Sequence, residues 1–264
     1  MVYNGLMNIT ILGAGAFGTA LGRVLENKGH QITYYSPHLN ISLEDAIKGA
    51  KCLILAVPSK VAPYLTPKLP TDIPLIVATK GILDPALFGN FKKVSALSGP
   101  GFANDINHER PTHLTATSPK VRDLFATSWL DFDLTSDFRG VLLCGALKNI
   151  YAIYAGLHNL KPGTKAHEDY LLSAAAEMKA ILLANDANPK TVDLNCGIGD
   201  LRLTCDYPSR NYEFGQKLIL DPNYQPEKTV EGVTALSRVK RGDLKLPKTA
   251  FIMKDLIKES EKWA

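Results

Sequence analysis

The sequence predicts an α/β protein in which a doubly wound, mostly parallel sheet is followed by an all-helical domain. Three observations lead to this fold class. Short apolar runs alternate with helical segments through the first half of the chain, a glycine-rich turn follows the first run, and strand patterns disappear after about residue 137. We therefore expect one domain at 1–137 and a second at 138–264, with the boundary near Ser136 to Gly140.

The strands of the first half are expected where apolar residues run without interruption, as in a sheet covered on both faces. The first run, Ile9 to Leu12, is followed by a helix that stops at Gly29, a residue suited to end a helix. Ser42 is placed to cap a short helix at 42–49. The other strands are expected at 31–36, 50–59, 73–81, 92–101, 111–118 and 131–136, with a helix at 119–130.

The second half is expected to be helical at 138–159, 168–185, 198–206, 209–220, 229–241 and 247–262. Its first helix contains LLCGALKNIYAIYAGL, which places Lys148 and Asn149 in an apolar run. A buried lysine must be paired, shifted in pKa or functional, whereas a lone lysine more often extends its ammonium group to the surface. A membrane span is disfavoured because the run is short and its centre is polar.

The composition is that of an ordinary soluble protein. The 264 residues are 45% hydrophobic and 21% charged, and the net charge of +4 includes no basic block that would indicate nucleic-acid binding. The four cysteines have no metal-ligand spacing and lie mostly in apolar runs, which predicts reduced thiols and no metal site. Because the N-terminus lacks a basic region and a cleavage site, we expect a cytoplasmic protein without membrane insertion.

The glycine turn after the first strand has the spacing G-x-G-x-x-G, formed by Gly13, Gly15 and Gly18. In a strand–turn–helix unit these glycines permit a tight turn, a close approach of the backbone to a pyrophosphate and close helix–strand packing. The helix N-terminus then offers N–H groups to phosphates. The turn predicts that 1–137 is a Rossmann-like dinucleotide-binding domain.

The choice of dinucleotide depends on the end of the second strand, where an NAD enzyme usually has an acidic residue. This chain instead has Tyr35, Ser36, Pro37 and His38. Ser36 and His38 are able to hydrogen-bond a 2′-phosphate, which favours NADP over NAD. The alternative is a simple turn.

Three further stretches contain polar residues that the packing of a hydrophobic core does not explain. VATKGI ends a buried strand on Lys80, LSGPGFA offers a glycine–proline turn, and GIGDLRLTC sets Asp200 and Thr204 four residues apart on one helix face. Ser209, Arg210 and Asn211 follow at an expected helix start. Each has a simpler alternative: a solvated loop lysine, an acidic residue at a helix N-terminus or an ordinary helix cap.

In the order GAGAFGTAL, ATKGI, LSGPGFA, GALKN, GIGDLRLTC, SRNYEFG and VEGV, the chain resembles bacterial NAD(P)-dependent glycerol-3-phosphate dehydrogenase from about residue 8 to about residue 235. The resemblance implies an oxidoreductase that interconverts dihydroxyacetone phosphate and sn-glycerol 3-phosphate for phospholipid synthesis. It implies Lys148 as the general acid/base at C2, with Lys80 as its cationic neighbour and Asp200 and Asn149 as orienting groups. Arg210 would offer a planar fork to the phosphate.

The residues implied by the resemblance form three sets. The catalytic set is Lys148, Lys80 and Asp200. The substrate set is Lys80, Gly99, Gly101, Lys148, Asn149, Asp200, Thr204, Ser209, Arg210 and Asn211. The cofactor set is Gly13, Gly15, Ala16, Phe17, Gly18, Ser36, His38, Pro58, Lys80, Ala103, Arg210 and Glu231.

The chain departs from the family pattern in three ways. Only PHLNISLEDAIKG remains between the second strand and AKCLILAVPS, so we expect a trimmed sheet and a more open adenine pocket. Gly101 stands where the family usually has Ser or Thr, and Ala16 replaces a common serine. The alternatives are therefore a related dehydrogenase for another anionic 2-oxo or 2-hydroxy compound, or a cofactor-binding homologue without turnover. A homodimer is expected only by analogy with the family.

Overall fold

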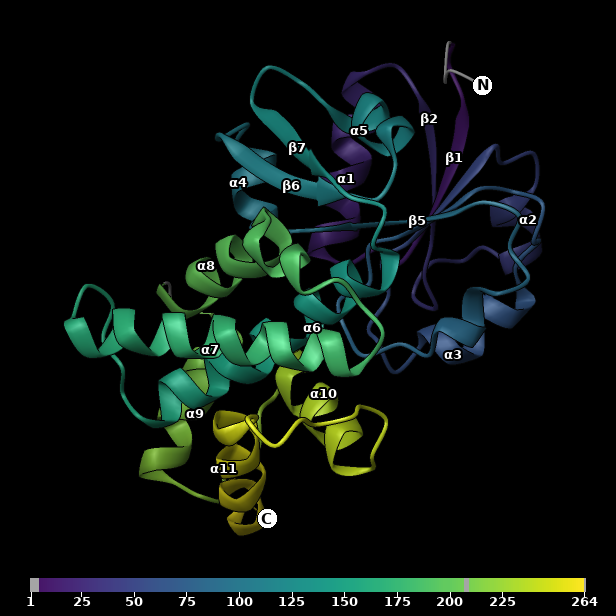
Figure 1. Ribbon diagram of the computed structural model, residues 1–264. Coiled ribbons are helices and arrows are strands. Elements are labelled where there is room, and N and C mark those ends of the chain that lie inside the picture. Colours follow the sequence, from purple (N-terminus) through teal and green to yellow (C-terminus); the bar gives the residue numbers. More distant parts are fainter. Residues whose placement is uncertain (1–4, 207–208, 264) are drawn as a thin grey trace. The chain divides into compact units, whose positions relative to one another are not determined.

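The computed structural model describes residues 5–206 and 209–263. By its internal contacts the chain divides into two compact units, one of residues 1–79 and 83–138 and one of residues 80–82 and 139–264. The first unit carries all the strands of the described residues, and the second is helical, as Figure 1 shows. The predicted fold class is confirmed.

The first unit is built on a seven-stranded sheet with the order β2-β1-β3-β4-β5-β6-β7. All neighbouring pairs are parallel except β5 and β6, which are antiparallel. The strands are β1 (Asn8–Leu12), β2 (Gln31–Tyr35), β3 (Cys52–Leu55), β4 (Leu75–Val77), β5 (Val94–Ser98), β6 (Thr112–Ala116) and β7 (Leu130–Leu134). The chain leaves β1 toward β2 on one side and returns to β3 on the other, which creates a topological switch point beside β1.

Helices cover both faces of this sheet, as strand alternation requires. Ile9 and Ile11 of β1 pack in the same core cluster as α1 (Ala16–Asn27). Thr10 points to the other face, where its hydroxyl donates to the carbonyl of Ala46 in α2 (Leu43–Ile47). The remaining short helices of this unit are α3 (Ala62–Leu65), α4 (Ala103–Asn107) and α5 (Pro119–Phe125), with 3-10 turns η1 (Thr66–Lys68) and η2 (Pro85–Phe88).

Several strands are shorter than the sequence predicts. β3 ends at Leu55 because the chain runs into Pro58, which has no N–H to donate to a ladder. β5 ends at Ser98 because Gly99 adopts a φ of 137° and Pro100 follows. The predicted helix at 119–130 ends at Phe125, since the N–H of Thr127 donates to the carbonyl of Leu130 in a turn that leads into β7.

The second unit is organised around α6 (Phe138–Leu157), which is buried on nearly all sides. This helix is long and apolar enough to cross a membrane by length and composition, but 89% of its apolar window is buried inside the protein, as in the core helix of a globular fold. The other helices are α7 (Lys165–Ala184), α8 (Asp200–Asp206), α9 (Arg210–Leu220), α10 (Glu231–Lys240) and α11 (Phe251–Glu259), with shorter turns η3 (Pro189–Asp193), η4 (Asn195–Gly199) and η5 (Ser260–Lys262).

Four predicted helix starts are wrong in the second unit. α7 begins at Lys165 rather than 168, because the Thr164 hydroxyl accepts the N–H of His167 and caps the helix earlier. α8 begins at Asp200 rather than 198, because the π-helical turn η4 precedes it.

The last two helices also begin later than predicted. α10 begins at Glu231 rather than 229, and α11 begins at Phe251 rather than 247 because a turn in which the Ala250 N–H donates to the Pro247 carbonyl precedes it.

Glycine lets the backbone of α9 approach α6 closely, since a Cβ on Gly156 would overlap the carbonyl oxygen of Tyr212 in α9.

Candidate active site

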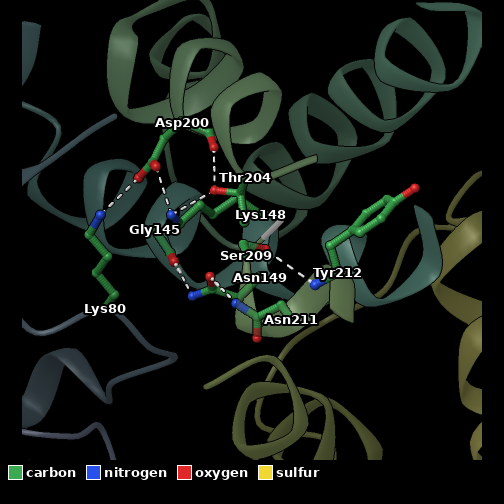
Figure 2. Close-up of polar contacts among 9 residues, drawn as sticks. All are labelled: Lys80, Gly145, Lys148, Asn149, Asp200, Thr204, Ser209, Asn211 and Tyr212. Carbon is green, nitrogen blue, oxygen red and sulfur yellow. Dashed lines mark hydrogen bonds and ion pairs between the residues drawn. The ribbon is translucent and has the colours of Figure 1, made fainter. Parts of the chain in front are cut away.

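Lys148 lies in the middle of α6 and is held by α8. Its side chain is 6% exposed, and its Nζ donates to Oδ1 of Asp200 at 2.6 Å and to Oγ1 of Thr204 at 2.9 Å (Figure 2). The lysine therefore does not extend to the surface. An ammonium group has three N–H donors, and these two bonds leave one direction for a further acceptor.

Asp200 joins two lysines. Its Oδ1 accepts from Lys148, and its Oδ2 accepts from Nζ of Lys80 at 3.1 Å, so the carboxylate lies between two ammonium groups (Figure 2). The Asp200 side chain is only 1% exposed. Two ammonium groups around one buried carboxylate favour an anionic ligand beside them.

The spacing of Asp200 and Thr204 on α8 explains how they meet Lys148. Residues four apart lie on one face of a helix, one turn above the other. The Thr204 hydroxyl donates to the Asp200 carbonyl at 2.6 Å and presents its lone pair to Lys148. The same helix face thus supplies both the charged and the neutral acceptor for the ammonium group.

Burial is the main influence on the proton affinity of Lys148. Desolvation lowers the pKa of Lys148 from 10.5 to about 8, opposed by the Asp200 carboxylate and assisted by the positive charge of Lys80. An amine with a pKa near 8 exists in both protonation states close to neutral pH. Lys148 is therefore suited to give and take a proton.

A second polar chain surrounds Asn149. Its amide nitrogen donates to the Gly145 carbonyl at 3.0 Å, and its amide oxygen accepts from Nδ2 of Asn211 at 2.9 Å (Figure 2). Asn211 also accepts the N–H of Gly232, at 2.9 Å. The sequence did not predict this pairing of the two asparagines, and the only sign of the Gly232 contact was the glycine itself. Both asparagines are buried and hold α6, α9 and α10 together beside Lys148.

The start of α9 carries two further predicted residues. The Ser209 hydroxyl accepts the N–H of Tyr212 at 3.2 Å and caps the helix, so it has the structural role that its position suggested. Arg210 is exposed, and its Nη1 donates to the Thr229 carbonyl at 3.2 Å. The guanidinium also lines a cavity of about 340 Å³, and Glu231 begins α10 two residues after Thr229. Among the described residues, Arg210 has no hydrogen bond to the Lys148 cluster.

The glycine turn of the first unit fits a pyrophosphate. Gly13 has a φ of 118° and lies against Ala56, so a side chain is excluded there by conformation and by space. A side chain is also excluded at Gly18, because a Cβ there would overlap the carbonyl oxygen of Gly13. Gly15 is different, because a Cβ on it would meet no atom within 4 Å and its φ of −78° suits any residue. The open space at Gly15 would let a ligand approach the backbone closely, as the glycine of a phosphate-binding turn does.

Gly15 is also the N-cap of α1, and no side chain of the described residues caps that end. Ala16 and Phe17 form the first turn, where the N–H groups of the helix N-terminus would face a phosphate. The turn is anchored to β2, because the Gly13 N–H donates to the Tyr35 carbonyl at 2.8 Å. The residues present therefore fit the pyrophosphate of a dinucleotide.

Ser36 and His38 follow β2 directly. The Ser36 hydroxyl accepts the His38 N–H at 3.4 Å, so the two residues form the turn that the sequence left as an alternative. Both follow Tyr35, the strand end that anchors the glycine turn. His38 and Pro58 are exposed.

The LSGPGFA segment joins β5 to α4 and has little room at its glycines. A Cβ on Gly101 would lie 3.0 Å from Cδ2 of Leu114 and 3.3 Å from Cδ1 of Ile106. A serine there would need Leu114 to shift, which gives a physical reason for the missing hydroxyl. Gly99 is held by its positive φ and by contact with Leu114, and Ala103 starts α4.

Comparison with known proteins identifies the family. The model for the C-terminal part of NAD-dependent glycerol-3-phosphate dehydrogenase matches residues 137–258, and the N-terminal model matches residues 8–41 and 37–123. The N-terminal match is in two pieces that meet at 37–41, where the sequence indicated a shortened segment.

The relatives extend over most of the chain. The glycerol-3-phosphate dehydrogenase (NAD(P)+) of Maridesulfovibrio salexigens is 30% identical over 315 aligned positions, covering 97% of this chain and 95% of the relative. This alignment is longer than the 264 residues of the chain, so the relative has segments that this chain lacks. The enzyme of the same name from Geobacter sp. strain M21 is 31% identical, covering 78% of this chain and 77% of the relative.

The fold is also similar to that of solved glycerol-3-phosphate dehydrogenases. A crystal structure of glycerol-3-phosphate dehydrogenase from Coxiella burnetii matches with a TM-score of 0.82 and 22% identity, covering 97% of this chain and 96% of that one. On the family models and the relatives together, the chain belongs to the NAD-dependent glycerol-3-phosphate dehydrogenase family, of which it is a shortened member.

Proposed function

We propose that the protein interconverts dihydroxyacetone phosphate and sn-glycerol 3-phosphate with NADP or NAD, and that it supplies glycerol 3-phosphate for phospholipid synthesis. The observation that carries the proposal is the buried cluster in which Asp200 lies between Lys80 and Lys148. A structural lysine needs one counter-charge, whereas here two ammonium groups share one buried carboxylate, and the described bonds of the Lys148 ammonium group use two of its three N–H donors.

Lys148 acts as the general acid/base. When bound, the nicotinamide cofactor supplies a hydride to C2 of the substrate or accepts one from it. In reduction Lys148 gives its proton to the C2 oxygen as negative charge develops there, and in oxidation it takes the hydroxyl proton. Asp200 and Thr204 hold the Nζ in place, so that little motion is needed at the moment of transfer.

Lys80 has two roles in this proposal. Its ammonium group stabilises the developing charge on the C2 oxygen or the phosphate of the substrate. Its positive charge also keeps the pKa of Lys148 low, which makes the neutral base available for oxidation. Arg210 supplies the fork for phosphate, and Ser209, Asn149 and Asn211 fix the backbone around it.

The cofactor would be held by the first unit at the Gly13–Gly18 turn, with its pyrophosphate at the N-terminus of α1. Ser36 and His38 favour a 2′-phosphate over a bare ribose, since the strand end has no acidic side chain. By the family resemblance, Pro58, Ala103 and Glu231 also belong to the proposed cofactor set, and Gly99 and Gly101 belong to the substrate set.

The test is oxidation of reduced cofactor by dihydroxyacetone phosphate in the purified protein, with NADPH and NADH in separate reactions. Rapid loss of nicotinamide absorbance with NADPH supports the proposal and the preference. A protein that binds NADPH but shows no oxidation with either cofactor would refute the proposed reaction and would point to another substrate or to a binding role.

One observation favours a second candidate, a dehydrogenase for another anionic 2-oxo or 2-hydroxy compound. Gly101 lacks the hydroxyl that the family usually places there, and Leu114 fills the space. Arg210→Ala separates the two substrates: it raises the KM strongly if a phosphate is bound there, and changes the KM little for a substrate that has no phosphate.

Cellular location and assembly are part of the same proposal. The four cysteines are all buried and form no disulfide, which favours the cytoplasm. A homodimer is supported by analogy with the family. Sedimentation of the purified protein decides the assembly.

A further inference from the structure

Arg238 of α10 contacts the segment that carries Lys80. Its Nη1 donates to the Ile82 carbonyl at 2.5 Å, and its Nε donates to Oδ2 of Asp243 at 2.7 Å. The Arg238 side chain is 19% exposed and the Asp243 side chain 31% exposed. None of the sequence motifs includes this arginine.

The segment 80–82 needs such an anchor. Within the first 138 residues it alone groups with the helical unit. It leaves the sheet after Thr79, whose hydroxyl donates to the Leu55 and Val57 carbonyls, and Gly81 gives the backbone wide conformational freedom. The Ile82 side chain is buried, so the carbonyl that Arg238 holds belongs to a fixed residue two positions from Lys80.

We propose that Arg238, held in turn by Asp243, is a positioning residue that fixes the backbone of Lys80 and keeps the Lys80 ammonium group against Asp200. The fork of the guanidinium carries this role, since one side binds the carbonyl while the other binds the carboxylate. The consequence for catalysis rests on the function proposed above, but the position of Lys80 does not.

Displacement of Lys80 changes the environment of Lys148. The charged and titratable groups that act on Lys148 are Asp200 and Cys205 of α8 and Lys80 of the loop. Without Lys80, Asp200 serves Lys148 alone and one cation that lowers the Lys148 pKa is lost. The Lys148 pKa then rises.

The matched pair of variants is Arg238→Gln and Arg241→Gln. Arg241 also faces Oδ2 of Asp243, at 3.5 Å, but it is 66% exposed and its described contacts include none with residues 80–82. Both variants lose one positive charge near the same carboxylate. Only the first releases the Ile82 carbonyl.

The first readout needs no turnover. Acetic anhydride modifies lysine amines, and peptide mass spectrometry measures the rate at Lys80 against Lys165, whose side chain is 87% exposed. We expect the Lys80 rate to rise about fivefold in Arg238→Gln, as the loss of one hydrogen bond predicts. The rate should stay at the parent value in Arg241→Gln. An unchanged rate in Arg238→Gln overturns the proposal.

The second readout is the pH profile of dihydroxyacetone phosphate reduction. In Arg238→Gln, kcat should fall by about tenfold because a catalytic cation is misplaced, and the high-pH limb should move upward. A loss of kcat with the parent pH profile would indicate general damage rather than positioning, and would overturn the proposal. A parent protein without turnover would refute the proposed function, while the labelling result would still decide on Arg238.

Asp243→Asn keeps the proposal testable if Arg238→Gln fails to fold. This variant leaves the guanidinium in place and weakens its support. A smaller rise in Lys80 labelling, with an unchanged melting temperature, is expected. No rise in Lys80 labelling in the folded Asp243→Asn protein would overturn the anchoring role.

Discussion

The burial of Lys148 predicts a specific pH dependence of stability, which Lys148→Met isolates. In the folded protein the Lys148 pKa is about 8, against 10.5 for an ordinary lysine. The unfolded chain therefore binds more protons than the folded chain between these values, and stability rises with pH across that window. Methionine has a similar length without a charge, so the variant lacks this rise.

The expected size follows from the two pKa values. Between pH 7 and pH 9.5, the parent should gain about 2 kcal/mol of unfolding free energy relative to Lys148→Met. Contributions that do not depend on pH, such as the lost bonds to Asp200 and Thr204, cancel in this difference. Groups that titrate equally in both proteins also cancel.

The assay is urea unfolding of both proteins at the two pH values, followed by tryptophan fluorescence. Trp263 lies edge-on to Phe214 with ring centroids 5.8 Å apart and reports on the helical unit, so both proteins carry Trp129→Phe. A difference that stays constant within about 0.5 kcal/mol between the two pH values would refute the lowered pKa of Lys148.

Three other predictions concern buried or close-packed residues. Glu177→Gln should lower the melting temperature by several degrees. The Glu177 carboxylate accepts the N–H groups of Ile252 and Met253 at the start of α11, each at 2.8 Å, and the loss of hydrogen bonds to a buried carboxylate is destabilising. Gly15→Ala should lower the melting temperature only slightly, since its Cβ meets nothing and alanine is merely a poorer N-cap, yet weaken NADPH binding measured by fluorescence at least tenfold; unchanged affinity would contradict the phosphate site. Gly101→Ser should destabilise the protein by about 1 kcal/mol in urea titrations, because Leu114 must shift, and an equally stable serine variant would show that the space is free.

Much of the first unit could be predicted because its signals are local. The apolar run of β1, the glycine spacing and the helix stop at Gly29 each depend on neighbours along the chain. The antiparallel pairing of β5 and β6 could not be predicted, since it depends on the path that the chain takes through α4. Strand ends were set by Pro58 and Gly99, residues that the predicted strands had included.

The candidate site was predictable only in part. Asp200 and Thr204 could be placed on one helix face from their spacing, but nothing in the sequence showed that the carboxylate would lie between Lys80 and Lys148. That contact joins residues 52 and 120 positions from Asp200, and such separations have no local pattern. The anchoring of Ile82 by Arg238 spans 156 positions and was not predicted for the same reason.

The central claim is that Lys148 transfers the proton at C2, and the most direct test compares the parent with Lys148→Met. The measurement is the rate at which dihydroxyacetone phosphate oxidises NADPH, with NADPH affinity measured on the same samples and the parent rate followed from pH 6 to pH 10. We expect a parent rate that declines above a pKa of about 8, and a variant that binds NADPH like the parent but does not turn over. A methionine variant with substantial turnover, or a parent rate that is flat over this range, would contradict the claim.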